Sequence, residues 1–387
     1  MQNFDYNIPT KVYFGKGQIE KLGEIKNYAS KVLMVYGGGS IKRAGIYDQA
    51  VSVLRENGVE FFELSGVDPN PRLETVELGK KLCLEKGLDG VLAIGGGSSI
   101  DCSKAIAAAV KYDGDVWDMT SDWSLMKEAL PVFVISTMAA TGSEMDAYAV
   151  ITKTETNEKK DLGGEPVIPK FSILDPKFTY SVPAYQTASG AADIISHVFE
   201  VYFNRTPEAY LQARMAEGIM NTVFQYGPIA VKEPKNYEAR ANLMWASSLA
   251  INGLLSNGCY LDWGIHPIEH ELSAYFDVTH GAGLAVVMPA WMEHVLREDS
   301  VDKFVEYAVN VWGVEAEGRD KYEVAREGIA KTRDHFVNDL GLPATLRDLG
   351  VPEDSLEMMA NNLDGALTGT FVPMTKEDVL AIYKACY

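Results

Sequence analysis

One local pattern occurs twice in this chain and constrains its fold more than any other feature. The apolar run Val32 to Tyr36 is followed by Gly37, Gly38, Gly39 and Ser40, and the apolar run Val91 to Ile94 is followed by Gly95, Gly96, Gly97 and Ser98. A buried strand that turns through glycines into a helix presents free backbone N–H groups and a helix N-terminus to an anion. The pattern therefore predicts two phosphate-binding turns in a sheet with crossover helices.

Both turns differ from the usual dinucleotide fingerprint GxGxxG, because Lys42 and Ile100 stand at its sixth position. A single glycine triplet fits a tight turn without a ligand as well as it fits a phosphate-binding turn. Two triplets in one domain favour a dinucleotide-binding site. A third apolar run, Pro131 to Ser136, leads into the hydroxyl residues Thr137 and Thr141. Ligands of open α/β sheets bind at the carboxyl ends of the strands, so we expect these hydroxyls at the same edge as the glycines.

The first half of the chain alternates short apolar runs with amphipathic stretches, which predicts a parallel sheet with crossover helices. Four prolines between Pro166 and Pro183 end this pattern, and helical periodicity continues to the C-terminus. We therefore predict a doubly wound α/β domain followed by a helical domain, with the boundary near residue 183. The predicted strands are 32–36, 60–64, 90–94, 131–136 and 171–174, and the predicted helices are 47–57, 73–86, 99–111, 186–203, 208–226, 238–255, 263–275, 301–311, 321–340 and 376–386.

The chain is acidic, because 54 Asp and Glu outweigh 35 Lys and Arg among its 387 residues and give a formal charge of −19. This charge repels phosphate backbones and anionic lipids, so we expect neither nucleic acid nor a membrane as a partner. A bound pyrophosphate must then be held by local dipoles and a few cations. Lys159 or Lys160 is a candidate for one cation, although the residues alone favour a solvated charge run.

The four cysteines are far apart and show no CxxC spacing, which is typical of reduced thiols in a cytosolic protein. The N-terminal residues lack a basic segment followed by an apolar run, and no stretch of about 20 apolar residues occurs. We expect a cytoplasmic protein.

Four of the six histidines lie within an 84-residue window of the predicted helical half. Asp193 and His197 are four residues apart on one predicted helix and share a face, and His266 and His270 repeat this spacing on another. His280 follows in a predicted turn that would fold it back onto them. Any one of these histidines, taken alone, is better explained as an ordinary surface or core residue than as a metal ligand. Together, one carboxylate and several imidazoles favour a site for a divalent transition metal. We predict Asp193, His197, His266 and His280 as ligands, with His270 beside them.

These residues carry a resemblance that covers nearly the whole chain. The chain resembles the iron-dependent (group III) alcohol dehydrogenase family, in its butanol dehydrogenase branch. The supporting segments are PTKVYFGKG at 9–17, GGGS at 95–98 with Asp101 and Lys104 after it, ATGSEMD at 140–146, LDP at 174–176, the Asp193 and His197 pair, ARANLMWASSLAINGLL at 239–255 and HPIEHELSAYFDVTHGAGL at 266–284.

The resemblance implies a Rossmann-like NAD(P)-binding domain over residues 1–183 and a helical, metal-binding and catalytic domain over residues 184–387. This is the fold that the family shares with dehydroquinate synthase, and its active site lies in the cleft between the domains. The family's metal ligands correspond to Asp193, His197, His266 and His280, and a histidine near the nicotinamide corresponds to His270. Its cofactor-binding positions correspond to Gly37, Gly38, Gly39, Ser40, Gly95, Gly96, Gly97, Ser98, Asp101, Thr137, Thr141 and Lys159.

The implied activity is metal-dependent hydride transfer between a nicotinamide and a small aldehyde or primary alcohol, such as butanal or butanol. The proton would come from His270 or from water beside the metal. The family name favours Fe²⁺, but three imidazoles and a carboxylate also suit Zn²⁺. Family members with an acidic residue after the first strand prefer NAD, and here that place holds glycines and Ser40. We therefore predict that NADP(H) is preferred and that NAD(H) is possible.

Two other functions remain open on the sequence alone. A dehydroquinate synthase-like lyase or a glycerol dehydrogenase-like enzyme would share the fold and the metal ligands, but a phosphorylated, carboxylated substrate needs more Lys and Arg than the region 193–283 holds outside its motifs. A non-enzymatic nucleotide-binding protein is the third possibility. The segment PTKVYFGKG resembles the family's strand that pairs across a dimer, so we expect a homodimer.

Overall fold

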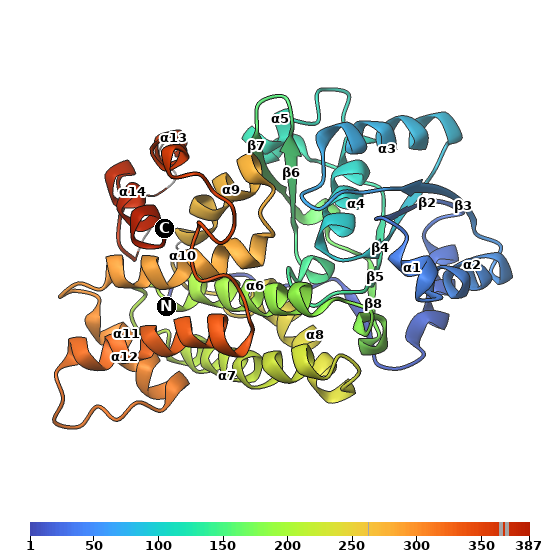
Figure 1. Cartoon of the computed structure of the whole chain (residues 1–387). Helices are drawn as coiled ribbons and strands as arrows, with labels where there is room; N and C mark the ends of the chain where they lie inside the picture. Colours follow the sequence, from blue (N-terminus) through green and yellow to red (C-terminus); the bar gives the residue numbers. More distant parts are fainter. Residues whose placement is uncertain (262, 364–366, 368–370) are drawn as a thin grey trace. The chain divides into compact units, whose positions relative to one another are not determined.

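The computed structural model describes residues 1–261, 263–363, 367 and 371–387, and the chain divides into two compact units (Figure 1). The sheet unit contains residues 7–182 and 234–248, and the helical unit contains residues 1–6, 183–233 and 249–387. The main change of unit therefore falls after Val182, beside the boundary expected at residue 183. Two short segments, 1–6 and 234–248, belong to the opposite unit from their neighbours in sequence.

The sheet unit is built on a six-stranded sheet in which every neighbouring pair of strands is parallel. The strand order is β1-β8-β5-β4-β2-β3. This confirms the predicted α/β fold with a parallel sheet. The strands are β1 (Lys11–Phe14), β2 (Lys31–Tyr36), β3 (Glu60–Ser65), β4 (Gly90–Gly95), β5 (Val132–Ser136) and β8 (Phe171–Leu174).

Side chains alternate between two apolar layers because successive residues of a strand point to opposite faces. On β2, Leu33 and Val35 pack with one cluster that contains residues of α3 (Leu73–Lys86) and α4 (Gly97–Ala109). Val32 and Met34 pack with another cluster, which contains residues of η1 (Gln18–Asn27) and α2 (Ile46–Glu56). Both faces of the central strands are thus covered, which is why these strands are apolar throughout.

The apolar pattern did not predict three strands, of which only β1 was expected, from the family resemblance of PTKVYFGKG. β1 lies at the edge of the sheet and is half exposed, so its sequence KVYF shows no continuous apolar run. β6 (Tyr148–Lys153) and β7 (Glu158–Gly163) form a separate antiparallel pair. The sequence of β7, EKKDLG, carries four charged residues, and its strand conformation is stabilised by pairing with β6 rather than by its own pattern. The short helices of this unit are α1 (Ser40–Arg43) and α5 (Asp118–Ser121), and the longer α8 (Tyr237–Ile251) continues from this unit into residues of the helical unit.

The helical unit contains no strand among its described residues. One prediction was wrong, because His280 does not lie in a turn but is the first residue of helix α10, a helix that was not predicted. α10 is buried along most of its length, so its apolar residues show no one-sided periodicity. The helices are α6 (Ala184–Tyr202), α7 (Tyr210–Lys232), α9 (Ile265–Phe276), α10 (His280–Val295), α11 (Val301–Trp312), α12 (Lys321–Asp334), α13 (Leu356–Asn362) and α14 (Lys376–Ala385).

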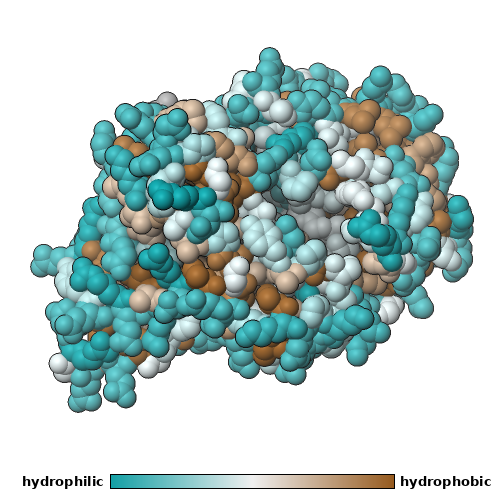
Figure 2. Space-filling view, viewed as in Figure 1, coloured by the Kyte–Doolittle hydropathy of each residue, from teal (hydrophilic) through white to brown (hydrophobic). Residues whose placement is uncertain are grey.

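The visible surface carries hydrophilic side chains over most of its area (Figure 2). A brown group of apolar side chains lies over α3, where Leu78 and Leu84 are exposed. Among the described residues, no helix combines the length and the hydropathy that a membrane span requires.

Candidate functional site

The two glycine turns lie at the carboxyl ends of β2 and β4, as predicted, and each leads into a helix. In the first turn Gly39 has a φ of 90°, a left-handed conformation that favours glycine, and α1 starts at Ser40. In the second turn α4 starts at Gly97. Each turn therefore places a helix N-terminus at the end of a buried strand. A short helix such as α1 contributes only its first N–H groups, so α4 is the stronger anion-binding element.

The loop after β5 packs directly against the second turn. The Thr137 N–H donates to the Gly95 carbonyl oxygen at 2.9 Å. A Cβ atom on Gly97 would lie 2.5 Å from the Thr141 side chain, and a Cβ on Gly96 would lie 3.2 Å from that of Met138. Glycine is therefore needed at residue 97 to let the two segments meet. The structure brings these predicted cofactor residues together at one edge of the sheet.

Two other predicted cofactor positions have well-defined surroundings. The Asp101 carboxylate, on α4, accepts hydrogen bonds from the Ser143 hydroxyl at 2.6 Å and from the Val150 N–H at 3.0 Å. Lys159 lies on β7, where it pairs with Thr152 of β6. Asp101 thus connects α4 to the segment between β5 and β6, and Lys159 belongs to the two-stranded sheet. Both residues lie in the sheet unit, like the glycine turns.

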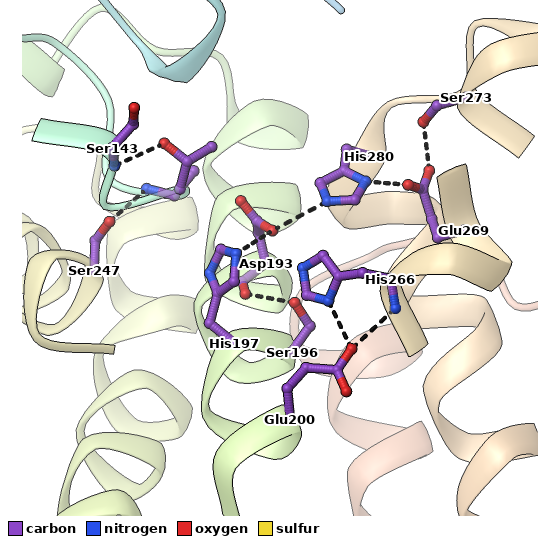
Figure 3. Close-up of polar contacts among 12 residues, drawn as sticks. Ser143, Asp193, Ser196, His197, Glu200, Ser247, His266, Glu269, Ser273 and His280 are labelled. Carbon is purple, nitrogen blue, oxygen red and sulfur yellow. Dashed lines mark hydrogen bonds and ion pairs between the residues drawn. The ribbon is translucent and has the colours of Figure 1, made fainter. Parts of the chain in front are cut away.

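The predicted metal ligands meet within the helical unit (Figure 3). α6 carries Asp193 and His197 one turn apart, α9 carries His266 near its start, and α10 begins with His280. One donor atom from each of Asp193, His266 and His280 can be chosen so that all three lie within 4.8 Å of one another. The His280 Nε2 atom lies 3.7 Å from the Asp193 Oδ1 atom. A carboxylate and two imidazoles at these separations fit a divalent transition metal.

The fourth predicted ligand, His197, lies beside this set. Its Nε2 atom is 3.9 Å from the Asp193 Oδ1 atom, and its ring stacks on that of His266 with 4.9 Å between centroids. Burial, together with the neighbouring His266, lowers the pKa of His197 well below its usual value. The neutral imidazole that this favours is the form that binds a metal. His270 lies near the same group, 5.4 Å from the His280 ring between centroids, and shares a second donor set with Glu269 and His280.

Two buried glutamates contact the Nδ1 atoms of two histidines of this set, and our sequence analysis missed both. Glu200 Oε1 lies 2.8 Å from the His266 Nδ1 atom, and Glu269 Oε2 contacts the His280 Nδ1 atom. A carboxylate at Nδ1 fixes the ring so that Nε2 is available for a metal. The sequence offered only an indirect signal: Glu200 follows His197 by three residues and Glu269 follows His266 by three, which places each glutamate on the same helix as a predicted ligand but does not show which histidine it contacts.

Glu200 also holds the start of α9. Its carboxylate accepts the N–H groups of Gly264 and Ile265 at 3.0 Å each and of His266 at 2.9 Å. These are N-terminal N–H groups that no residue of the helix itself can satisfy. Burial raises the pKa of Glu200 to about 8, and the backbone donors oppose this shift.

Two glycines after His280 allow α10 to approach its neighbours. A Cβ atom on Gly281 would lie 1.9 Å from the Ser189 carbonyl oxygen of α6, and a Cβ on Gly283 would lie 2.7 Å from Glu269 Oε1. No larger residue fits at either position without moving backbone or the glutamate. The sequence HGAG therefore allows His280 to reach Asp193.

Comparisons with known proteins cover both units. Residues 9–176 match the family model described as iron-containing alcohol dehydrogenase, and residues 187–387 match the model for the C-terminal domain of the same family. The NADH-dependent butanol dehydrogenase B of Clostridium acetobutylicum is 57% identical over 99% of both chains. The NADPH-dependent aldehyde reductase YqhD of Escherichia coli is 39% identical over 94% of this chain and 93% of that protein. The crystal structure of NADH-dependent butanol dehydrogenase A from Thermotoga maritima is 40% identical, covers 100% of this chain and 99% of that one, and has a TM-score of 0.95.

Proposed function

The chain belongs to the iron-containing alcohol dehydrogenase family, as its sequence motifs indicated, and we propose that it reduces small aldehydes such as butanal to primary alcohols with NAD(P)H. It is an NAD(P)-dependent oxidoreductase of the alcohol dehydrogenase class. The observation that carries the proposed chemistry is the set of Asp193, His266 and His280, with donor atoms within 4.8 Å of one another. The family match also favours this activity over the lyase alternative.

We propose that Asp193, His197, His266 and His280 hold one divalent metal ion. When bound, such an ion polarises a carbonyl oxygen, and a reduced nicotinamide supplies the hydride. The family description supports iron, although the same donors also suit zinc.

The surrounding residues would orient these groups and supply a proton. Glu200 and Glu269 hold the rings of His266 and His280 through their Nδ1 atoms. His270 lies beside His280 and is partly exposed, so it is the side chain that we propose to deliver the proton to the alcohol oxygen. Asp193, His197 and His266 are buried, which limits the access of water to these side chains.

We propose that the cofactor binds at the two glycine turns with Ser40, Ser98, Thr137 and Thr141, and that NADPH is preferred over NADH. The first turn, residues 37–40, contains no carboxylate that would repel a 2′-phosphate. Lys42 follows this turn, but its ammonium lies 3.3 Å from the Glu63 carboxylate, which offsets part of its charge. The expected preference is therefore modest. The relative that is 57% identical to this chain is named as NADH-dependent, and the relative that is 39% identical is named as NADPH-dependent.

A panel of straight-chain aldehydes, assayed with NADPH and with NADH and combined with elemental analysis, tests this function. We expect turnover of butanal with both cofactors, a higher kcat/KM with NADPH, and one equivalent of iron or zinc per chain. Prolonged treatment with a chelator should abolish turnover, and either Fe²⁺ or Zn²⁺ should restore it. Turnover that persists after complete metal removal would contradict the metal assignment, and a strong NADH preference would contradict the cofactor proposal.

We further propose that the protein is a homodimer that pairs through β1. Within the described part of the chain, this strand lies at the end of the sheet and pairs with β8, which leaves its other backbone edge without a partner strand in this sheet. Light scattering coupled to gel filtration should give the mass of two chains at micromolar concentration. A monomer across the whole concentration range would reject the dimer.

A cytoplasmic location is also proposed. The four cysteines form no disulfide, and Cys83, Cys102 and Cys386 are buried. Free thiols of this kind are typical of a reducing compartment.

A further inference from the structure

A buried ion pair involves α4, the helix that follows the second glycine turn, and the chemistry proposed above does not use it. Lys104, on α4, is 0% exposed, and its Nζ atom lies 2.6 Å from the Asp146 Oδ1 atom. Asp101 and Ser143 complete this group, which we call the Lys104 cluster. All four residues belong to the sheet unit. A buried ammonium is costly unless several groups satisfy it, so such a cluster tolerates little movement of its members.

Lys104 connects α4 to the segment that follows β5. Besides the Asp146 carboxylate, its ammonium donates to the Ser143 hydroxyl at 2.9 Å, to the Asp146 carbonyl oxygen at 3.1 Å and to the Tyr148 carbonyl oxygen at 2.8 Å. These acceptors extend from η3 (Ser143–Met145) to the start of β6. Any shift of the segment would therefore break bonds to a buried charge.

Ser143 transmits this restraint to the proposed cofactor site. Its hydroxyl accepts from Lys104 and donates to Asp101 Oδ1 at 2.6 Å, so both of its roles are fixed. Its N–H donates to the Thr141 hydroxyl oxygen at 3.2 Å. Thr141 packs against Gly97, the first residue of α4. Because Thr141 already accepts this bond, its own O–H is oriented away from Ser143 and available to a ligand at the turn.

The other end of the loop is held by different partners. The Ala140 N–H donates to the Ser247 hydroxyl of α8 at 3.1 Å (Figure 3). The Thr137 N–H donates to the Gly95 carbonyl oxygen at 2.9 Å. Hydrogen bonds therefore hold the loop on both sides of Thr141. Those of Thr137 and Ala140 hold its N-terminal side, and the Lys104 cluster holds its C-terminal side.

We propose that the Lys104 cluster positions Thr141 for the dinucleotide, and that Asp101 acts through Ser143 rather than by touching the cofactor. This inference rests on the proposed function, because it places the cofactor at the glycine turns. Both Asp101 carboxylate oxygens already accept a bond, from Ser143 and from Val150. A preorganised loop loses little freedom on binding, so the cluster contributes to affinity without contacting the ligand.

The variant Ser143→Ala tests this role, because it removes the hydroxyl that joins this segment to Lys104 and Asp101, so the Ser143 N–H that donates to Thr141 is no longer held in place. The Lys104 and Asp146 pair remains. We expect the Kd of NADPH, measured by titration of the protein's fluorescence, to rise about 10-fold, the cost of one misplaced hydrogen bond. Because the loss is in binding, kcat at saturating NADPH should change by no more than about 2-fold. The metal content should not change.

Ser103→Ala is the matched control. Ser103 is also a buried serine of the sheet unit, but its hydroxyl donates to the Ser99 carbonyl oxygen within α4 and does not reach the loop. We expect both variants to be folded at the assay temperature, with Ser143→Ala the less stable because it removes a partner of buried Lys104 and of Asp101, and only Ser143→Ala to bind NADPH more weakly. Equal Kd values for the two variants would overturn the proposal.

A double-mutant cycle with Asp101→Asn separates the two roles of Asp101. If Asp101 acts through Ser143, Asp101→Asn weakens NADPH binding in the unaltered protein but has no further effect in Ser143→Ala. Additive effects would instead show direct contact with the cofactor and overturn the proposal. If the unaltered protein bound neither NADPH nor NADH, the proposed function itself would fail, which is a distinct result.

Discussion

Replacing His280 with alanine is expected to remove the bound metal and to lower kcat/KM for butanal by at least about 10³-fold, because a metal ion contributes several kcal/mol to such reactions. His280 provides one of three donors that lie within 4.8 Å of one another, and its side chain is 22% exposed. It is also the first residue of α10, where alanine is well tolerated. The substitution should therefore remove a ligand without unfolding the helical unit.

His294→Ala is the matched control for this variant. His294 is also 22% exposed and hydrogen-bonds to Asp378, but it lies outside the proposed metal set. Elemental analysis and steady-state kinetics on both variants check the expectation, and circular dichroism checks their folding. A folded, metal-free His280→Ala protein that retained full turnover would contradict the metal assignment.

The fold was predictable where burial imposes a regular pattern. β2, β4 and β5 are covered on both faces, so they are apolar along most of their length and stand out in the sequence. The apolar pattern missed β1, which only the family resemblance indicated, because it is an edge strand with exposed side chains, and it missed β7 because the residues of β7 are mostly charged. Burial also hid α10, since a helix that is apolar on all sides has no amphipathic period.

The candidate site was predictable only where its residues share one helix, because spacing in the sequence shows such neighbours and does not show contacts between helices. Spacings of four residues on one helix revealed Asp193 with His197, and His266 with His270. The partners of the ligands were not found, because Glu200 bonds to His266 across 66 residues and Glu269 contacts His280 from a different helix. Such contacts depend on how α6, α9 and α10 pack, and the glycines that permit this packing show no role until their neighbours are known.

The second large effect is expected for Glu200→Ala, which should lower both stability and metal affinity. Alanine would leave the buried N–H groups of Gly264, Ile265 and His266 without their carboxylate acceptor. At about 1–3 kcal/mol for each unsatisfied donor, the free energy of unfolding should fall by about 3 kcal/mol or more. The His266 ring would also lose the contact that orients it, which typically costs about 10- to 100-fold in metal affinity.

The variant Glu200→Gln separates these two effects. Glu200 Oε1 accepts from Ile265 N and His266 N and contacts His266 Nδ1, whereas only Gly264 N donates to Oε2. An amide oxygen in the Oε1 position keeps the start of α9 in place, but the side chain can no longer ionise beside the His266 ring. We therefore expect Glu200→Gln to unfold at a temperature much closer to that of the unaltered protein than Glu200→Ala does, and to bind metal more weakly, as measured by competition with a chelator. If Glu200→Gln bound the metal as tightly as the unaltered protein, the role of Glu200 would be limited to holding the N-terminus of α9.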